Sequence, residues 1–240
     1  MFLDDLTVST HESIVRYGNV LKYLKDRNVT AEDVRRYRIG YGRVLSIPDD
    51  GTSDRKRFME ESAYGRRFEN MILFPFTEPL GRVVGLIGRS LENKYFKIFA
   101  TEEAKSTGFF FGLAQALPEI YRTGRAFVVE GPFDTVALSK VAPNTIGALT
   151  AGLNDAQFKL LRLYCDNIVT VFDSDAPGER ATNKGQEWVG ESNEGLDMRE
   201  RWKIRNIRLG YKDPDYCLKS MGISKFQEYV SRKIKEIPPW

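Results

Sequence analysis

The sequence predicts an α/β protein, in which an α+β N-terminal part precedes a mostly parallel sheet flanked by helices. Two observations predict this fold class. From about residue 121 onward, short apolar runs alternate with helical patterns, as they do in the βα units of a parallel sheet. Before that point, the apolar runs at 71–76 and 82–88 are joined by a turn-like stretch, which is typical of a β-hairpin.

The elements of the second part follow from its pattern. The strands are continuous apolar runs without polar alternation, which indicates that helices cover both faces of the sheet. Strands are expected at 126–130, 145–149, 167–173 and 203–209. Helices are expected at 132–142, 154–165, 177–189, 213–222 and 223–237.

The first part contains weaker signals. Residues 18–39 are expected to form two short helices, because Thr30 followed by Asp33 resembles a capping box within the segment. The stretch 46–65 is polar and contains Pro and Gly, so a long loop is expected there. In the hairpin, Pro75 favours an edge or bulge position. The expected divisions are an N-terminal basic subdomain at 1–120, a sheet domain at 121–220 and a C-terminal helix at 221–240.

The composition limits the chemistry. The chain has 240 residues with a single histidine, His11, and two cysteines, Cys165 and Cys217. One His and two isolated Cys cannot build a zinc finger or a multi-histidine metal site, so no zinc is expected. A Ser-His-Asp or Cys-His relay would depend on His11, which lies in a polar stretch near a chain end, where side chains are often poorly held. Any catalysis is therefore expected to rely on carboxylates, Lys, Arg or an oxygen-bound cation.

The charge balance and the hydropathy are those of a soluble protein. Lys and Arg total 36 against 33 Asp and Glu, a net charge of +3, so any nucleic-acid surface must be local. No apolar run approaches the ~18 residues of a membrane helix, and the N-terminus lacks a signal pattern. Since cysteines are few, the expected location is the reducing cytoplasm, without a membrane partner.

Acidic residues follow the ends of the predicted strands. Three of the strands are each followed by a pair of carboxylates. In open parallel sheets, ligands bind beyond the carboxyl ends of the strands, so these side chains are expected at one rim of the sheet. The pairs are Glu130 and Asp134, Asp173 and Asp175, and Asp213 and Asp215.

Carboxylates crowded at one rim repel one another unless a cation neutralises them. Mg²⁺ binds a few carboxylates together with waters and substrate phosphates, so a divalent-cation site is expected at this rim. Each acid also has an alternative role, because Asp and Glu commonly cap helix N-termini. Asp134, Asp175 and Asp213 can each be such a cap, and their grouping at three strand ends is what favours metal binding.

Basic residues form a second group around the hairpin, and aromatic residues lie between them. Such mixtures suit phosphate contacts combined with base stacking. The alternative is solvated Arg on helix faces with the aromatic rings in a core. The hairpin glycines can cradle a phosphate, although a tight hairpin explains them more simply. The residues concerned are Arg35, Arg36, Arg38, Arg55, Lys56, Arg57, Arg66, Arg67, Arg89 and Lys94, with Tyr37, Tyr41, Phe58, Tyr64, Phe68 and Tyr95, and the glycines Gly81, Gly85 and Gly88.

The three acidic segments resemble the motifs of a TOPRIM domain, the metal-binding fold of bacterial primases, type IA and II topoisomerases and some nucleases. They read VVEGPFDTVAL at 128–138, VFDSDAPG at 171–178 and KDPD at 212–215. The segment 66–103, which contains RRFENMILFPF, resembles the basic subdomain that precedes TOPRIM in DnaG-type bacterial primases. Residues 23–42 are similar to the entry helices of that family. The resemblance spans about residues 20–220 and identifies the chain as similar to a DnaG-type catalytic core.

The resemblance implies roles for individual residues. Glu130 matches a glutamate that binds metal or acts as an acid or base. Arg67, Arg89 and Lys94 match basic positions that hold the triphosphate or the template backbone. The implied metal ligands are Glu130, Asp134, Asp173, Asp175, Asp213 and Asp215, and the implied catalytic residues are Glu130, Asp173 and Asp175.

The implied function is template-directed synthesis of short RNA primers on single-stranded DNA. A 3′-hydroxyl attacks the α-phosphate of an NTP and pyrophosphate leaves, with two or more Mg²⁺ or Mn²⁺ ions. The implied partners are the single-stranded DNA template, NTPs, a replicative helicase and a separately encoded zinc-binding module.

Several features depart from the family pattern. Met71 and Ala176 stand where the family has basic residues. The sequence contains neither the zinc module nor a helicase-binding domain, as expected for a catalytic core alone or for a short primase of a phage or mobile element. A TOPRIM nuclease is an alternative, but it would leave 66–103 unexplained. A topoisomerase needs a catalytic tyrosine on a separate domain, and only a short helix is expected after residue 220, so this class is disfavoured. The intact carboxylates argue against a non-catalytic single-strand-binding remnant.

Overall fold

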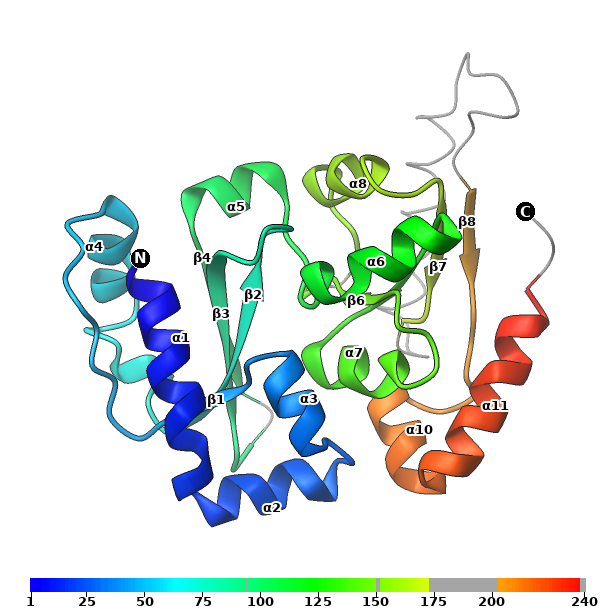
Figure 1. Ribbon diagram of the computed structural model, residues 1–240, viewed down its shortest axis with the longest axis horizontal. Coiled ribbons are helices and arrows are strands. Elements are labelled where there is room, and N and C mark those ends of the chain that lie inside the picture. The colour runs from blue at the N-terminus through cyan, green and yellow to red at the C-terminus, as the bar shows by residue number, and fades with distance from the viewer. Residues whose placement is uncertain (94, 150–151, 173–202, 238–240) are drawn as a thin grey trace. The chain divides into compact units, whose positions relative to one another are not determined.

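An antiparallel sheet and a parallel sheet form the centres of two units in the computed structural model (Figure 1). The structure describes residues 1–93, 95–149, 152–172 and 203–237. The N-terminal unit is Met1–Ser106 and the C-terminal unit is Thr107–Trp240. The α/β fold class predicted from the sequence is confirmed.

The N-terminal unit is built on a four-stranded antiparallel sheet with the strand order β1-β2-β3-β4. The predicted hairpin is its centre, because β2 and β3 pair from Met71↔Ser90 to Thr77↔Val83 with an irregularity at Phe76/Thr77. Pro75 lies beyond the part of β2 that pairs with β1, so its missing N–H leaves no ladder bond unmade. The strands are β1 (Gly40–Gly42), β2 (Met71–Thr77), β3 (Val83–Ser90) and β4 (Phe96–Ala100).

The helices of this unit partly follow the sequence signals. The two predicted helices in 18–39 are present, and the capping box separates them: Asp33 N–H donates to Thr30 Oγ1 at 3.2 Å, and Thr30 N–H donates to Asp33 Oδ2 at 2.7 Å. The helices are α1 (Phe2–Ser13), α2 (Gly18–Asp26), α3 (Ala31–Arg36), α4 (Ser53–Glu61) and α5 (Glu102–Thr107), with short 3₁₀ turns at η1 (Ile14–Arg16) and η2 (Arg66–Phe68).

Two expectations for the N-terminal unit are wrong. The stretch 46–65 is not a continuous loop, because α4 forms within it behind the N-cap Thr52, and Phe58 anchors it in the core. The first residues are not a loosely held polar end, since α1 buries Phe2 and Leu3 completely against the sheet. Both helices bury few apolar side chains, so their sequences lack the long periodicity by which helices are recognised.

The C-terminal unit contains a parallel sheet with the strand order β6-β5-β7-β8. All four expected strands are present, although each ends earlier than predicted. The helix expected at 177–189 lies outside the described residues. The strands are β5 (Arg125–Val129), β6 (Thr145–Gly147), β7 (Asn167–Thr170) and β8 (Lys203–Asn206), and the helices are α6 (Leu113–Thr123), α7 (Pro132–Ser139), α8 (Asp155–Arg162), α10 (Pro214–Met221) and α11 (Ile223–Lys235).

Both faces of the parallel sheet are buried, as its apolar strands predict. In β5, Ala126 and Val128 pack with α6 and α8 on one face, whereas Phe127 and Val129 pack with α7, α10 and α11 on the other (Figure 1). The C-terminal helix α11 therefore belongs to this unit, and so does α6, since Phe111 just before it bridges to Gly147. The division lies between Ser106 and Thr107.

Candidate active site

Two of the predicted acids lie in the turn from β5 into α7. Glu130 directly follows β5 and is half-buried. Gly131 is the N-cap of α7 and Pro132 its first residue, so the chain reverses within two residues. A Cβ on Gly131 would lie 3.2 Å from Asp134 Oδ2, which shows that the Asp134 carboxylate folds back over the turn. Asp134 is therefore held close to the strand end that Glu130 follows.

The start of α10 meets the start of α7 at this place. Asp134 Oδ1 accepts a hydrogen bond from the backbone N–H of Asp215 at 3.2 Å, across 81 residues of sequence. Asp215 is buried, with 9% of its surface exposed. The two helices pack through Leu138 and Leu218, among others, in one apolar cluster, and this burial fixes their N-termini side by side.

Asp213 has the capping role that the sequence allowed. It is the N-cap of α10, and its Oδ1 accepts from Tyr216 N–H at 2.6 Å, while Lys212 Nζ lies 3.5 Å from its Oδ2. Asp134, by contrast, is in the first turn of α7 but does not cap it. Both helix starts place partial positive charge beside these carboxylates and reduce the cost of grouping them.

Four of the six predicted acids can thus be located. Glu130, Asp134, Asp213 and Asp215 lie at the turn after β5 and at the start of α10, and a hydrogen bond joins two of them. Asp173 and Asp175 lie outside the described residues. Within the described part of the chain, no three His, Cys, Asp or Glu side chains are grouped closely enough to hold a metal ion.

Two residues at this turn were not singled out from the sequence. A Cβ on Gly147, at the end of β6, would lie 2.6 Å from Thr135 Oγ1, so only glycine lets α7 approach the sheet this closely. Thr135 Oγ1 in turn donates to Gly131 O at 2.8 Å and braces the turn. A glycine at the end of a buried strand is the signal that points to such an approach.

The predicted basic residues do not form a single group. Arg67 is exposed, and its Nη1 donates to Glu61 O at 3.2 Å. Arg89 pairs across the sheet with Phe96, on the face opposite the one where Phe68, the neighbour of Arg67, packs. Lys94 lies outside the described residues.

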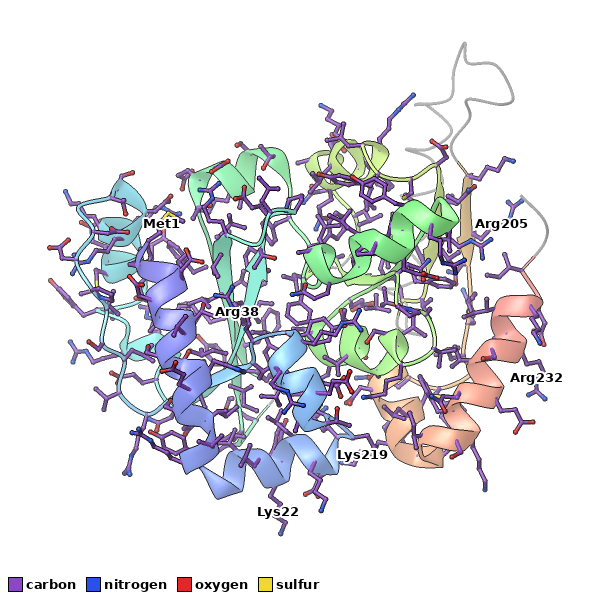
Figure 2. All side chains as sticks on the ribbon, in the orientation of Figure 1. Met1, Lys22, Arg38, Arg205, Lys219 and Arg232 are labelled. Atoms are coloured by element: carbon purple, nitrogen blue, oxygen red, sulfur yellow. The ribbon has the colours of Figure 1, made fainter. Side chains whose placement is uncertain are left out.

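Several other arginines of the predicted basic zone are paired within the N-terminal unit. Arg57 lies 2.9 Å from Asp54 and 3.0 Å from Glu102, and its guanidinium is 4.5 Å from the centre of the Phe99 ring. Arg55 pairs with Asp49 at 3.4 Å, and Arg38, in the turn between α3 and β1 (Figure 2), lies 3.9 Å from Asp4. These pairs stabilise the unit and make these arginines poor candidates for phosphate binding.

The hairpin glycines make room for neighbouring side chains, which agrees with the simpler interpretation that a tight hairpin requires them. A Cβ on Gly85 would lie within 1.9 Å of the Phe76 ring, and a Cβ on Gly88 would lie 2.6 Å from the Met71 sulfur. Gly81 adopts φ 94° in the turn, where other residues are strained. The glycines let aromatic rings and Met71 lie flat on the sheet.

Comparisons with known proteins add to this geometry. Residues 9–108 match the family described as the N-terminal domain of the DNA primase catalytic core, and residues 127–218 match the Toprim-like family. The two matches follow each other without overlap and together cover most of the chain. The chain belongs to the DnaG-type primase family. The predicted resemblance is thereby confirmed.

Related primases are considerably longer than this chain. The DNA primase of Clostridium acetobutylicum is 28% identical over 232 residues, which cover 90% of this chain and 38% of that protein. The DNA primase of Synechococcus elongatus is 32% identical over 176 residues, covering 70% and 25% of the two chains. The chain thus spans about two-fifths or less of the length of these relatives.

Solved primase structures share the fold. A structure of the DnaG catalytic core superposes with a TM-score of 0.75 at 22% identity, over 96% of this chain and 78% of that one. The zinc-binding and RNA polymerase domains of the Aquifex aeolicus primase give a TM-score of 0.71 at 23% identity, over 97% and 59% of the two chains. A DnaG primase catalytic domain bound to single-stranded DNA gives 0.73 at 22% identity, over 96% and 79%.

Two further findings concern the primase core as a whole. Cys165 and Cys217 are both buried; burial and the charge of Asp166 raise the pKa of Cys165 to about 12, while burial and the charge of Asp213 raise that of Cys217 to about 11. Both thiols are therefore protonated near neutral pH. Of the helices that the structure describes, none has the length and apolar character needed to cross a membrane.

Proposed function

We propose that this chain is the catalytic core of a DNA primase and synthesises short RNA primers on single-stranded DNA by nucleotidyl transfer from NTPs. The observation that carries the proposal is the DnaG-type N-terminal domain followed by a Toprim-like domain in which the acids of the first and third motifs meet. The hydrogen bond from Asp215 N–H to Asp134 Oδ1 joins those two motifs.

The proposed reaction joins the 3′ oxygen of the growing primer to the α-phosphorus of an NTP. The bond from that phosphorus to the β-phosphate bridging oxygen breaks, and pyrophosphate leaves. Glu130, which follows β5, is proposed to accept the hydroxyl proton, with Asp173 and Asp175 as the other proposed catalytic acids. Arg67, Arg89 and Lys94 are proposed to hold the triphosphate or the template backbone.

The donor set at the rim fits a hard divalent cation. Its side chains are carboxylates, which Mg²⁺ and Mn²⁺ prefer, and the protein offers no histidine or thiolate there. When bound, two or more such ions would neutralise the negative charge that develops on the transferred phosphate. The proposed ligands are Glu130, Asp134, Asp173, Asp175, Asp213 and Asp215.

The proposed partners follow from the same assignment. One similar solved structure is described as bound to single-stranded DNA, and another contains a zinc-binding domain beside the polymerase domain. We propose a single-stranded template, NTPs, a replicative helicase and a separately encoded zinc-binding module as partners. The site of action would be the cytoplasm of a bacterium or of a phage-infected cell.

The proposal is tested with a pair of matched variants. Asp134→Asn keeps an oxygen that can accept from Asp215 N–H but removes the charge. Asp155→Asn removes an exposed acid in the first turn of α8, which packs on the other face of the sheet. Each protein is incubated with single-stranded DNA, labelled NTPs and Mg²⁺ or Mn²⁺. We expect primers from the wild type and from Asp155→Asn, and a loss of about two orders of magnitude in Asp134→Asn.

The same assay distinguishes the alternatives. Shortened DNA without RNA products would point to a TOPRIM nuclease and would overturn the primase proposal. Binding of DNA with neither product would indicate a non-catalytic module. Full activity of Asp134→Asn would remove this residue from the site.

A further inference from the structure

Three consecutive residues of the N-terminal unit have left-handed backbone conformations. Ala63, Tyr64 and Gly65 have φ angles of 50°, 60° and 81°. They connect α4 to the 3₁₀ turn η2, and we call them the left-handed turn. Glycine adopts this conformation without strain, and a larger residue would not fit at position 65, because a Cβ on Gly65 would lie 2.4 Å from Ile47 Cδ1. Ala63 and Tyr64 are strained in this conformation, because a Cβ makes it unfavourable.

The core on both sides determines the shape of the left-handed turn. Phe58 before it and Phe68 after it are fully buried and stack on each other, with ring centres 5.4 Å apart and planes 23° apart. Tyr64 N–H donates to Met59 O at 2.6 Å, and Gly65 N–H donates to Ser62 Oγ at 2.9 Å. The two rings and these bonds hold the turn, so its exposed side chains are presented from a rigid base.

Tyr64 contributes little to that rigidity. The residue is 69% exposed, so it recovers little apolar burial in return for a strained backbone. Glycine or asparagine would meet the conformational demand at lower cost. A large exposed aromatic side chain at a strained position is therefore better explained by an external partner than by folding.

Two exposed arginines follow directly. Arg66 Nε donates to Ala63 O at 3.3 Å, and Arg67 Nη1 donates to Glu61 O at 3.2 Å. Each bond fixes one N–H of a guanidinium that carries five, so other donors remain to reach a phosphate. The nearby acid Glu61 is itself paired with Arg57 at 3.3 Å, which limits its repulsion of an anion.

We infer that Tyr64 is a stacking platform for one base of a single-stranded nucleic acid, whose flanking phosphates are bound by Arg66 and Arg67. An exposed ring beside guanidinium groups is the combination by which proteins bind single strands without reading their sequence. This inference rests on the proposed function, in which the template is such a strand, and adds a contact outside the acidic rim.

The test separates stacking from phosphate binding. Fluorescence anisotropy measures the affinity for a labelled oligothymidylate and for the same oligonucleotide with abasic units in place of the thymidines. An oligouridylate in a parallel titration shows whether DNA or RNA is preferred. The variants are Tyr64→Gly, which removes the ring and relieves the strain, and Tyr64→Phe, which keeps the ring. Tyr121→Ala is the matched control, because Tyr121 is 63% exposed and lies in the C-terminal unit.

We expect Tyr64→Gly to weaken binding of oligothymidylate about fivefold to 100-fold, which is the range for losing one stacked base. Tyr64→Phe and Tyr121→Ala should bind as the wild type does. The abasic strand should bind the wild type and Tyr64→Gly equally, and the melting temperature of Tyr64→Gly should not fall.

Unchanged affinity of Tyr64→Gly would overturn the inference, and so would an equal loss on the abasic strand, since a lost base stack cannot affect a strand without bases. The proposed function is judged separately. If Tyr64→Gly binds normally while Asp134→Asn loses primer synthesis, the stacking inference fails and the primase proposal stands. If binding depends on Tyr64 but no primers form, the inference stands and the primase proposal fails.

Discussion

The N-terminal unit pairs some of its arginines with two or more carboxylates each, whereas the C-terminal unit brings acidic residues of two separate motifs together. In the first, Arg57 and Arg82 each lie within 3.0 Å of two carboxylates, counting Asp54 and Glu102 for the former and Glu78 and Glu103 for the latter. In the second, Asp215 N–H donates to Asp134 Oδ1 at 3.2 Å, so two acidic residues of separate motifs meet. Internal pairing stabilises a fold, but grouped carboxylates require helix dipoles or a cation, and they mark the place where chemistry is expected.

The two cores differ as well. Aromatic rings fill the core of the N-terminal unit, where Phe58 contacts Phe2, Phe68 and Phe99 with ring centres 4.9 to 5.4 Å apart. Aliphatic side chains of the strands and helices predominate in the two clusters of the C-terminal unit. A few large rings therefore fill much of the first core, whereas many smaller side chains fill the second. A single substitution should lower the free energy of unfolding more in the first core than in the second.

The largest expected effect comes from the aromatic core. Phe58→Ala should lower the free energy of unfolding by about 3–5 kcal/mol, because it leaves a cavity among three rings. Hydrogen exchange measured by mass spectrometry should then rise in α1, β2 and β3. Phe226→Ala, at a fully buried position of α11, is the counterpart and should raise exchange in α10 and β5. Equal exchange profiles for the two variants would contradict the description of two separate cores.

A smaller effect is expected from the paired charges. Burial disfavours the charged guanidinium of Arg57, but hydrogen bonds to Asp54 and Glu61 outweigh it and raise its pKa. Arg57→Ala should therefore lower the free energy of unfolding by about 2 kcal/mol, since Asp54, Glu61 and Glu102 lose their ion pairs with its guanidinium. The control is Arg122→Ala, whose ion pair with Glu119 is exposed and should not matter. Equal urea midpoints for Arg57→Ala and the wild type would show that the network is not stabilising.

Asp213 allows the two roles of an acidic residue to be separated. Asp213→Ala removes the cap of α10 and should cost about 1 kcal/mol of unfolding free energy. Asp213→Asn keeps an oxygen for Tyr216 N–H and should retain wild-type stability. If Asp213 also binds a cation, both variants should lose primer synthesis. Wild-type activity of Asp213→Asn would leave this residue with its capping role alone.

The smallest effect at neutral pH concerns the buried thiols. Their raised pKa values mean that the native state keeps protons that the unfolded state releases above about pH 8.5. The free energy of unfolding should thus be independent of these groups below that pH and should fall as the pH rises toward 11. Denaturant unfolding of the wild type and of the double variant Cys165→Ala and Cys217→Ala checks this. If the free energy of unfolding falls equally steeply with rising pH in both proteins, groups other than these two thiols cause the fall.

Local signals were strong enough to predict much of the fold. The strands around Val128 and Val169 are continuous apolar runs, and the parallel sheet buries them on both faces. Thr30 and Asp33 form the capping box that their spacing indicates, because that motif involves only four consecutive residues.

Elements that depend on contacts with distant parts of the chain were not predictable in this way. Helix α4 contains one buried aromatic residue, Phe58, and depends on a ring supplied by Phe68. Helix α6 has Pro118 in its interior, where proline usually ends a helix, and it forms because Leu113, Leu117 and Ile120 are buried in the apolar cluster. The left-handed turn at Ala63 and Tyr64 has no sequence signature at all, since neither residue favours that conformation.

The sequence by itself predicted the succession along the chain of the strands in the parallel sheet, the acids behind three of those strands, and a chemistry that does not depend on histidine or thiolate groups. These properties depend on the type and spacing of neighbouring residues. Only the tertiary structure decided that Asp134 meets Asp215, that Arg55 and Arg57 are committed to internal pairs, and that Tyr64 is presented outward on a strained turn. Each of these depends on contacts between distant segments, which are formed only when the apolar clusters pack.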